Sequence, residues 1–176
     1  TEDTTGLPFT GRSGKLQDQL VREQGIEPNS LAWLNVIGCR SAATRWDEDR
    51  PPTPVERIAC SERTWMLFCA LRPSVVLCLG VESTAAFWTE PPPPWTWHEV
   101  PSPVPGAPAL VVGHARHPSY MLRTVSAPGG EREYEAARHF YRALAERLPY
   151  LRKLPGWTHH LQYLADMAGG RVLVGT

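Results

Sequence analysis

Short apolar runs recur along the chain, and turn-forming residues bound each of them. Runs rich in Val, Leu and Ile are typical of strands that lie buried within a sheet. The segments expected as strands are 31–37, 74–80, 107–113 and 171–175.

Segments with helical spacing of apolar residues lie between these runs. The clearest start signal is a capping box at Thr53, with Pro54 at the first helical position and Glu56 three residues after the cap. Strands that alternate with helices favour a parallel sheet covered on both faces. The segments expected as helices are 13–24, 53–71, 83–88, 130–148 and 158–167.

The alternation predicts a fold of the α/β class, with three αβα layers around a central, mostly parallel four-stranded sheet. With 176 residues, the chain has room for one sizeable core, so we expect a single domain over 1–176. Segment 41–52 is polar, and segment 89–108 is rich in proline around Trp95 and Trp97. Both are interpreted as loops, the second as a stiff surface linker.

Charge and hydropathy exclude several classes of protein. Eighteen basic residues balance eighteen acidic ones, which excludes a polybasic protein that holds nucleic acid by bulk charge. No apolar run approaches the roughly 20 residues of a membrane span, and the polar start lacks the pattern of a signal peptide. We therefore expect a soluble protein of the cytoplasm, without a membrane partner.

Candidate chemistry follows the predicted strands, because ligands of open parallel sheets bind at the carboxyl ends of the strands. The Gly-rich loop 6–14 runs into a helix start, where free N–H groups can hold a phosphate or a base carbonyl. Asn35 lies within an otherwise apolar run, and its amide can match the edge of a pyrimidine. Segment 114–123 carries two imidazoles, a hydroxyl and two arginines. The alternative for the loop 6–14 is a turn that serves packing alone. The alternative for segment 114–123 is an ordinary surface loop.

Three blocks, in this order, resemble the uracil-DNA glycosylase superfamily and its family 4 branch. They are Gly-Leu-Pro-Phe-Thr-Gly-Arg-Ser-Gly-Lys-Leu at 6–16, Leu-Asn-Val-Ile-Gly-Cys-Arg at 34–40 leading to Arg-Pro-Pro-Thr-Pro at 50–54, and His-Pro-Ser-Tyr-Met-Leu-Arg at 117–123. The last block is the most specific, and the resemblance covers roughly residues 2 to 148.

The resemblance implies an enzyme that flips a uracil or related base out of DNA and hydrolyses its N-glycosidic bond. Phe9 would then stack on the flipped base and Asn35 would hydrogen-bond its Watson–Crick edge. His117 would stabilise the charge that develops on the oxygen of the leaving base. The implied catalytic residues are His117 and Asn35.

The resemblance also implies contacts with DNA around the flipped nucleotide. Tyr120, Met121 and Leu122 would form an apolar wedge that fills the vacated space. Ser119 and Arg123 would contact flanking phosphates. Beyond the resemblance, we expect DNA contacts from Arg12, Ser13, Arg40 and Arg116. The expected partner is DNA, bound by a monomer.

The chain departs from the family at the acidic motif, Gly-acid-x-Pro-Gly, that positions the attacking water. The motif would precede Glu2 and Asp3, which are surrogate candidates for its carboxylate. Segment 170–176 resembles the missing strand and its first glycine, which would mean a circular permutation with Thr176 at the position of the acid. A chain trimmed at its N-terminus, with an unrelated last strand, is the alternative, and both stay open.

The family also holds an iron–sulphur cluster on four cysteines, of which Cys39 and Cys60 match two. Cys69, within an apolar helical segment, and Cys78, within a strand, are interpreted as buried apolar residues. We therefore predict no cofactor and no metal, with an iron–sulphur cluster as the alternative.

Three functional hypotheses stay open at this point. The first is a glycosylase for uracil or a related base. The second is a non-catalytic DNA-binding member that retains the base pocket but lacks the water-activating residue. The third is a glycosylase for a different modified base, since Asn35 alone does not determine the size of a pocket.

Overall fold

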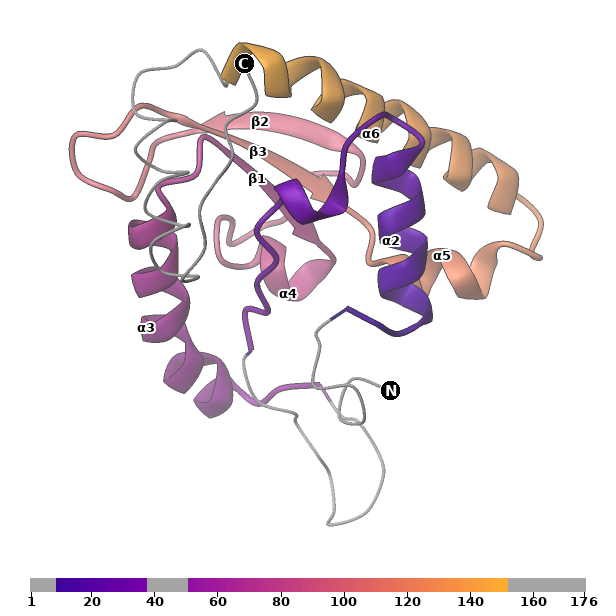
Figure 1. Ribbon diagram of the computed structural model, residues 1–176. Helices are drawn as coiled ribbons and strands as arrows, with labels where there is room; N and C mark the ends of the chain where they lie inside the picture. Colours follow the sequence, from indigo (N-terminus) through magenta and orange to yellow (C-terminus); the bar gives the residue numbers. More distant parts are fainter. Residues whose placement is uncertain (1–8, 38–50, 152–176) are drawn as a thin grey trace.

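The computed structural model describes residues 9–37 and 51–151 and confirms the α/β class (Figure 1). The described elements are, in chain order, α2 (Arg12–Arg22), the 3-10 turn η1 (Pro28–Ser30), α3 (Pro54–Leu71), β1 (Val75–Leu79), α4 (Val81–Thr84), β2 (Thr96–Val100), β3 (Leu110–Ala115), α5 (Pro118–Thr124) and α6 (Gly130–Leu151).

The sheet of the described residues has the strand order β1-β3-β2 and is mixed. β1 runs parallel to β3, with Val75 opposite Val111 and Leu79 opposite Ala115. β2 runs antiparallel to β3, with Thr96 opposite His114. The predicted mostly parallel, four-stranded sheet is therefore not what these residues form. Its predicted last strand, 171–175, lies outside the described residues.

The strand predicted over 31–37 is wrong, because this segment is irregular. Its backbone carbonyls accept hydrogen bonds from side chains of α3 instead of from a neighbouring strand. Arg63 Nη2 donates to the Asn35 carbonyl over 2.9 Å, and Thr64 Oγ1 donates to the Val36 carbonyl over 3.0 Å. An apolar run becomes a strand only where another strand pairs with its backbone.

The loop predicted over 89–108 contains β2, so that interpretation is wrong in part. The prolines of 91–94 end just before the ladder begins, and Trp95 takes a left-handed conformation at φ 66°. Its backbone N–H donates to the His114 carbonyl over 2.6 Å, which starts the pairing with β3. Prolines flank an edge strand without removing a ladder hydrogen bond, so a proline-rich composition hid this strand.

Alternate side chains of β1 enter two separate hydrophobic clusters. Val75, Leu77 and Leu79 pack with α2, α5 and α6, whereas Val76 and Cys78 pack with α3 and the turn after α4. Figure 1 shows these helices on opposite faces of the sheet. The described part of the chain therefore has the three predicted layers. The buried residues of the first cluster are Leu20, Val21, Ile26, Ala115, Met121, Ala137, Phe140, Tyr141 and Leu144.

The predicted capping box is present at the start of α3. The Thr53 backbone N–H donates to Glu56 Oε2 over 2.7 Å, and the Glu56 N–H donates to Thr53 Oγ1 over 3.3 Å. The helices predicted over 13–24 and 130–148 correspond to α2 and α6, while α4 is shorter than the predicted 83–88. Segment 158–167 lies outside the described residues. No helix in the described ranges is long and apolar enough to cross a membrane.

The sheet packs closely against α6 at Gly113, and this contact supplies a stability prediction. A Cβ at this position would lie 2.6 Å from Trp97 Cζ3 and 2.7 Å from Phe140 Cζ, and these rings stack at a centroid distance of 4.5 Å. We expect Gly113→Ala to lower the free energy of unfolding by about 1–3 kcal/mol in urea titrations. Gly11→Ala is the control, because a Cβ there meets nothing within 4 Å. Equal stability of the two variants would contradict this packing.

Candidate functional site

The carboxyl ends of β1 and β3 meet at His117. Gly80 follows β1 at φ 85°, and its N–H donates to the Ala115 carbonyl at the end of β3 over 2.8 Å. A Cβ on Gly80 would lie 3.0 Å from His117 Cβ, so only glycine allows this approach with this backbone. The sheet thereby holds His117 at the edge where ligands of such folds bind.

His117 caps the N-terminus of α5 with its own side chain. The Ser119 N–H donates to His117 Nδ1 over 3.2 Å, and Ser119 Oγ lies 2.8 Å from the same nitrogen. A ring nitrogen that accepts from a backbone N–H carries no proton itself. The neutral ring therefore carries its proton on Nε2, and Ser119 positions this imidazole.

The environment of His117 favours the neutral ring. Partial burial of the imidazole, followed by the positive charge of Arg123, lowers the pKa of His117 below its usual 6.5. The residue as a whole is still exposed, so the ring is accessible to a ligand from outside. At neutral pH the site presents an accessible, uncharged N–H donor.

The predicted wedge residues have different environments on α5. Tyr120 and Leu122 are half-buried, whereas Met121 is only 4% exposed and belongs to the core below the helix. The Met121 side chain therefore faces the core in this structure, and its place in the DNA wedge stays a prediction. The cause is helical periodicity, since neighbouring residues of a helix point to different sides.

Arg116 has partners within the protein, although it was expected at a flanking phosphate. Its guanidinium forms an ion pair with Glu133 and lies over the ring of Tyr120, 4.5 Å from the ring centroid. Glu133 also accepts a hydrogen bond from Trp95 Nε1 over 2.8 Å. The other arginines of the predicted interface are placed differently: Arg12 and Arg123 are exposed, and Arg40 lies outside the described residues.

Phe9 is held in a left-handed conformation, with φ 59°, at the entry to α2. A Cβ on Gly14 would clash with the Phe9 carbonyl oxygen, so glycine is required at this position of the first helical turn. The ring of Phe9 lies 5.5 Å from the ring of Trp33, in a tilted arrangement. Non-glycine residues in this conformation are uncommon and gather at binding sites.

Asn35 is exposed, so the predicted buried amide on a strand is wrong. Trp33 lies two residues before Asn35, and its ring contacts the ring of Phe9. This contact joins the Phe9 loop to the segment that carries Asn35. His117 contacts Gly80 and Ser119 instead. The structure therefore links two of the three predicted base-contacting residues through Trp33 and holds the third at the end of the sheet.

The described cysteines do not supply a cluster site. Burial raises the pKa of Cys78 to about 12, so this residue is a protonated core thiol, as predicted. Cys69 is exposed on α3, so its interpretation as a buried residue is wrong. Within 9–37 and 51–151, no three His, Cys, Asp or Glu side chains gather as metal ligands. Cys39 lies outside these ranges, and the absence of a cofactor stays a prediction.

The structure adds Gly80, Trp95 and Glu133 to the neighbourhood of the site, and the sequence signals for them were unequal. A glycine directly after an apolar strand run is a usual signal for a tight turn, so Gly80 was recognisable. Trp95 was hidden by the surrounding prolines. Glu133 carried no signal, since charged residues are common in the first turn of a helix. The surrogate acids Glu2 and Asp3, and Thr176, lie outside the described residues.

The pKa of His117 supplies a second prediction. A titration followed by NMR should give a value below 6.5, and Arg123→Gln should raise it, because the neighbouring positive charge disfavours the imidazolium. Because the unfolded chain takes up this proton first, the stability contributed by the neutral ring is lost as the pH falls below 6.5. Arg142→Gln, an exposed arginine on α6, is the control. A lower or unchanged pKa in Arg123→Gln would contradict the assignment.

Comparison with known proteins identifies the family. The family model described as the uracil DNA glycosylase superfamily matches residues 1–146. The type-4 uracil-DNA glycosylase of Thermotoga maritima is 36% identical over 86 residues, which are 49% of this chain and 42% of that protein. The type-4 enzyme of Archaeoglobus fulgidus is 34% identical over 79 residues, 45% of this chain and 37% of that protein.

These matches confirm the resemblance drawn from the three sequence blocks. The matched segments span less than half the length of the curated relatives. The chain belongs to the uracil DNA glycosylase superfamily and is similar to its type-4 members.

Proposed function

We propose that the protein is a DNA glycosylase that flips uracil, or a related base, out of DNA and hydrolyses its N-glycosidic bond. The observation that carries the proposal is the capped, neutral ring of the exposed residue His117, held at the carboxyl end of the sheet. Family membership and the names of the relatives support it.

Bond cleavage leaves negative charge on the departing base, chiefly on its carbonyl oxygens. A fixed donor aimed at such an oxygen stabilises the transition state without having to reorganise. The cap holds the His117 ring at Nδ1, which leaves Nε2–H to donate to the base in this proposal. Water then adds to the sugar carbon as its bond to the base breaks. The proton that the water loses passes through solvent to the anionic base, so the products are a free base and an abasic site.

Base recognition falls to Phe9 and Asn35 in this proposal. The Phe9 ring supplies an aromatic face for stacking, and its backbone conformation is fixed by the close approach to Gly14. The exposed amide of Asn35 offers an N–H donor beside an oxygen acceptor, and this pair matches the Watson–Crick edge of uracil. A second form of this proposal is a glycosylase that excises a different modified base, which would require a pocket of a different size from one that fits uracil.

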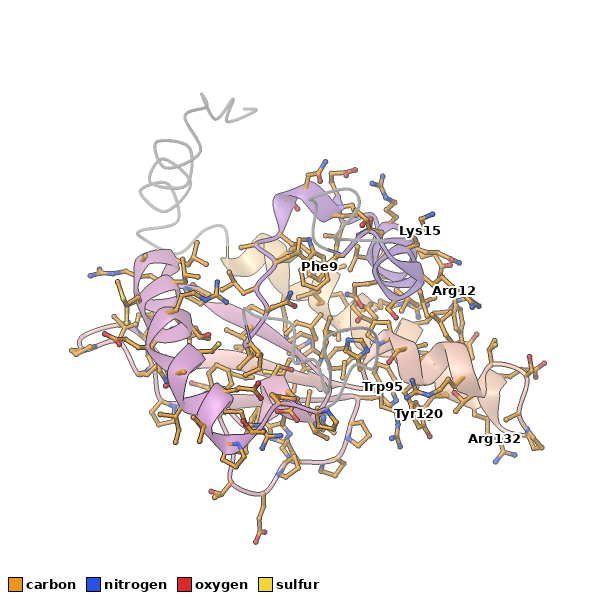
Figure 2. All side chains as sticks on the ribbon, turned by 90° about the horizontal axis from the view of Figure 1, so that it is seen from below. Phe9, Arg12, Lys15, Trp95, Tyr120 and Arg132 are labelled. Carbon is orange, nitrogen blue, oxygen red and sulfur yellow. The ribbon has the colours of Figure 1, made fainter. Side chains whose placement is uncertain are left out.

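The DNA surface in this proposal extends from the start of α2 to α5. Figure 2 shows Arg12 and Lys15 on α2 and Tyr120 on α5, and these helices pack on one another. Tyr120 and Leu122 would enter the space left by the flipped base, while Arg12, Ser13 and Arg123 meet phosphates. With a net charge of zero, affinity rests on a few such contacts, so its salt dependence is modest. The protein acts as a monomer on DNA in this account.

A non-catalytic DNA-binding member of the same superfamily, which would retain the base pocket without hydrolysing the bond, is the alternative. Glu2 and Asp3 are the proposed sources of a carboxylate that activates water. Excision assays on single- and double-stranded oligonucleotides with uracil, hypoxanthine or modified cytosine decide between the two. Abasic sites support the enzyme, whereas tight DNA binding without any abasic product supports the reader.

His117→Ala is the central test of mechanism. We expect the single-turnover excision rate to fall by about 10²–10³-fold, because one fixed donor to the leaving base is lost. The dissociation constant for uracil-containing DNA should change little, since the donor acts mainly in the transition state. His139→Ala, an exposed histidine on α6, is the control. Parallel losses of binding and rate would contradict the assigned role.

Asn35→Asp tests whether Asn35 recognises the Watson–Crick edge of the flipped base. A carboxylate cannot donate to the uracil carbonyl as the amide does, so the preference among bases should change. The measurement compares excision rates for uracil, cytosine and hypoxanthine in the same oligonucleotide. An unchanged profile would remove Asn35 from this role.

A further inference from the structure

The proline-rich segment before β2 is hydrogen-bonded to β3, although it takes no part in the proposed base excision. Trp95 N–H donates to the His114 carbonyl over 2.6 Å, and His114 Nδ1 lies 2.7 Å from the Pro92 carbonyl. His114 is only 6% exposed, so these hydrogen bonds lie within the core. The indole of Trp95 is further held edge-on against Phe140, at a centroid distance of 5.7 Å.

Trp95 uses this fixed position to hold a carboxylate. Its Nε1–H donates to Glu133 Oε1 over 2.8 Å, and the same oxygen pairs with Arg116. The Glu133 side chain is 23% exposed, and that of Arg116 is 38% exposed. The pair is therefore partly desolvated, where a charge interaction is stronger than at the open surface.

Arg116 contacts both Glu133 and Tyr120 and so connects the carboxylate to the proposed wedge. The guanidinium lies over the Tyr120 ring at 4.5 Å, and Tyr120 follows three residues after His117. A cation over an aromatic face attracts the ring and limits its rotation. A continuous set of contacts thus runs from Trp95 through Glu133 and Arg116 to Tyr120.

We propose that Glu133 is a positioning residue, which holds Arg116 over Tyr120 so that the tyrosine ring is aimed into duplex DNA beside the flipped base. This inference rests on the proposed function. The wedge fills the gap that flipping leaves in the paired stack of a duplex, whereas a single strand has no base pairs to replace. Glu133 should therefore matter for double-stranded DNA and not for single-stranded DNA.

Glu133 also neutralises a cation that stands next to the DNA surface. Without this carboxylate, Arg116 is released from its partner and becomes available to a phosphate. Loss of Glu133 should therefore strengthen DNA binding at low salt while it slows excision from a duplex. A merely structural role would weaken both.

The experiment measures single-turnover excision at saturating protein from uracil-containing duplex and from the same single strand. For Glu133→Ala we expect the duplex rate to fall about tenfold and the single-strand rate to stay within about twofold. Trp95→Phe, which keeps the ring but removes the N–H donor, should show a smaller loss in the same direction. Glu135→Ala is the matched control, because Glu135 is an exposed carboxylate on the same helix, paired with Arg138.

A double-variant cycle with Tyr120→Ala isolates the coupling. If Glu133 acts through Tyr120, adding Glu133→Ala to Tyr120→Ala should cause no further loss on the duplex. Additive losses, or equal losses on duplex and single strand, would overturn the positioning role. Melting curves report folding, and Glu133→Gln carries the same test if Glu133→Ala does not fold.

The design keeps failure of this inference separate from failure of the proposed function. If the unvaried protein excises uracil from neither substrate, the enzymatic function fails. Fluorescence of 2-aminopurine placed beside the uracil then reports base unstacking in the duplex. Reduced unstacking in Glu133→Ala supports the positioning role, and unchanged unstacking overturns it.

Discussion

The hydrogen bond from the Ser119 N–H to Nδ1 of His117 joins the fold to the proposed chemistry. It satisfies a backbone donor at the start of α5, and it determines which ring nitrogen carries the proton. Burial and the positive charge of Arg123 lower the pKa of His117 and so favour the neutral ring. The cap favours the neutral ring as well, because protonation of Nδ1 would break it. Helix stability and a neutral donor therefore depend on the same atom.

The sheet places this cap at the carboxyl end of β3, where the proposed base would bind. Parallel pairing of β1 and β3 brings Gly80 against His117, and the absent side chain at Gly80 allows the approach. On one face of the sheet, α2 and α6 pack around α5, with Met121 and Tyr141 in their common core. His117 therefore rests on packed elements, while the separate Phe9 loop is held by its close approach to Gly14.

Local signals in the sequence predicted the parts of the fold that local chemistry decides. The capping box of Thr53 and Glu56 and the buried run of β1 are examples. The errors came from partners that are distant in the chain: segment 31–37 lacks strand pairing, and β2 pairs despite its prolines. α5 was missed because its block was interpreted for chemistry alone, although Pro118 at the first helical position signals a helix start.

The candidate site shows the same division. His117 was predictable from its motif, but its tautomer needed the position of Ser119, and the burial of Met121 needed the packing of α5. The set of contacts from Trp95 to Tyr120 joins three separate segments, so no window of sequence contains it.

The most direct test of the account is a measurement of the His117 ring nitrogens by ¹⁵N NMR at neutral pH. The account predicts an unprotonated Nδ1 and a protonated Nε2 in the free protein. A ring protonated at Nδ1, or at both nitrogens, would contradict both the cap of α5 and the neutral donor.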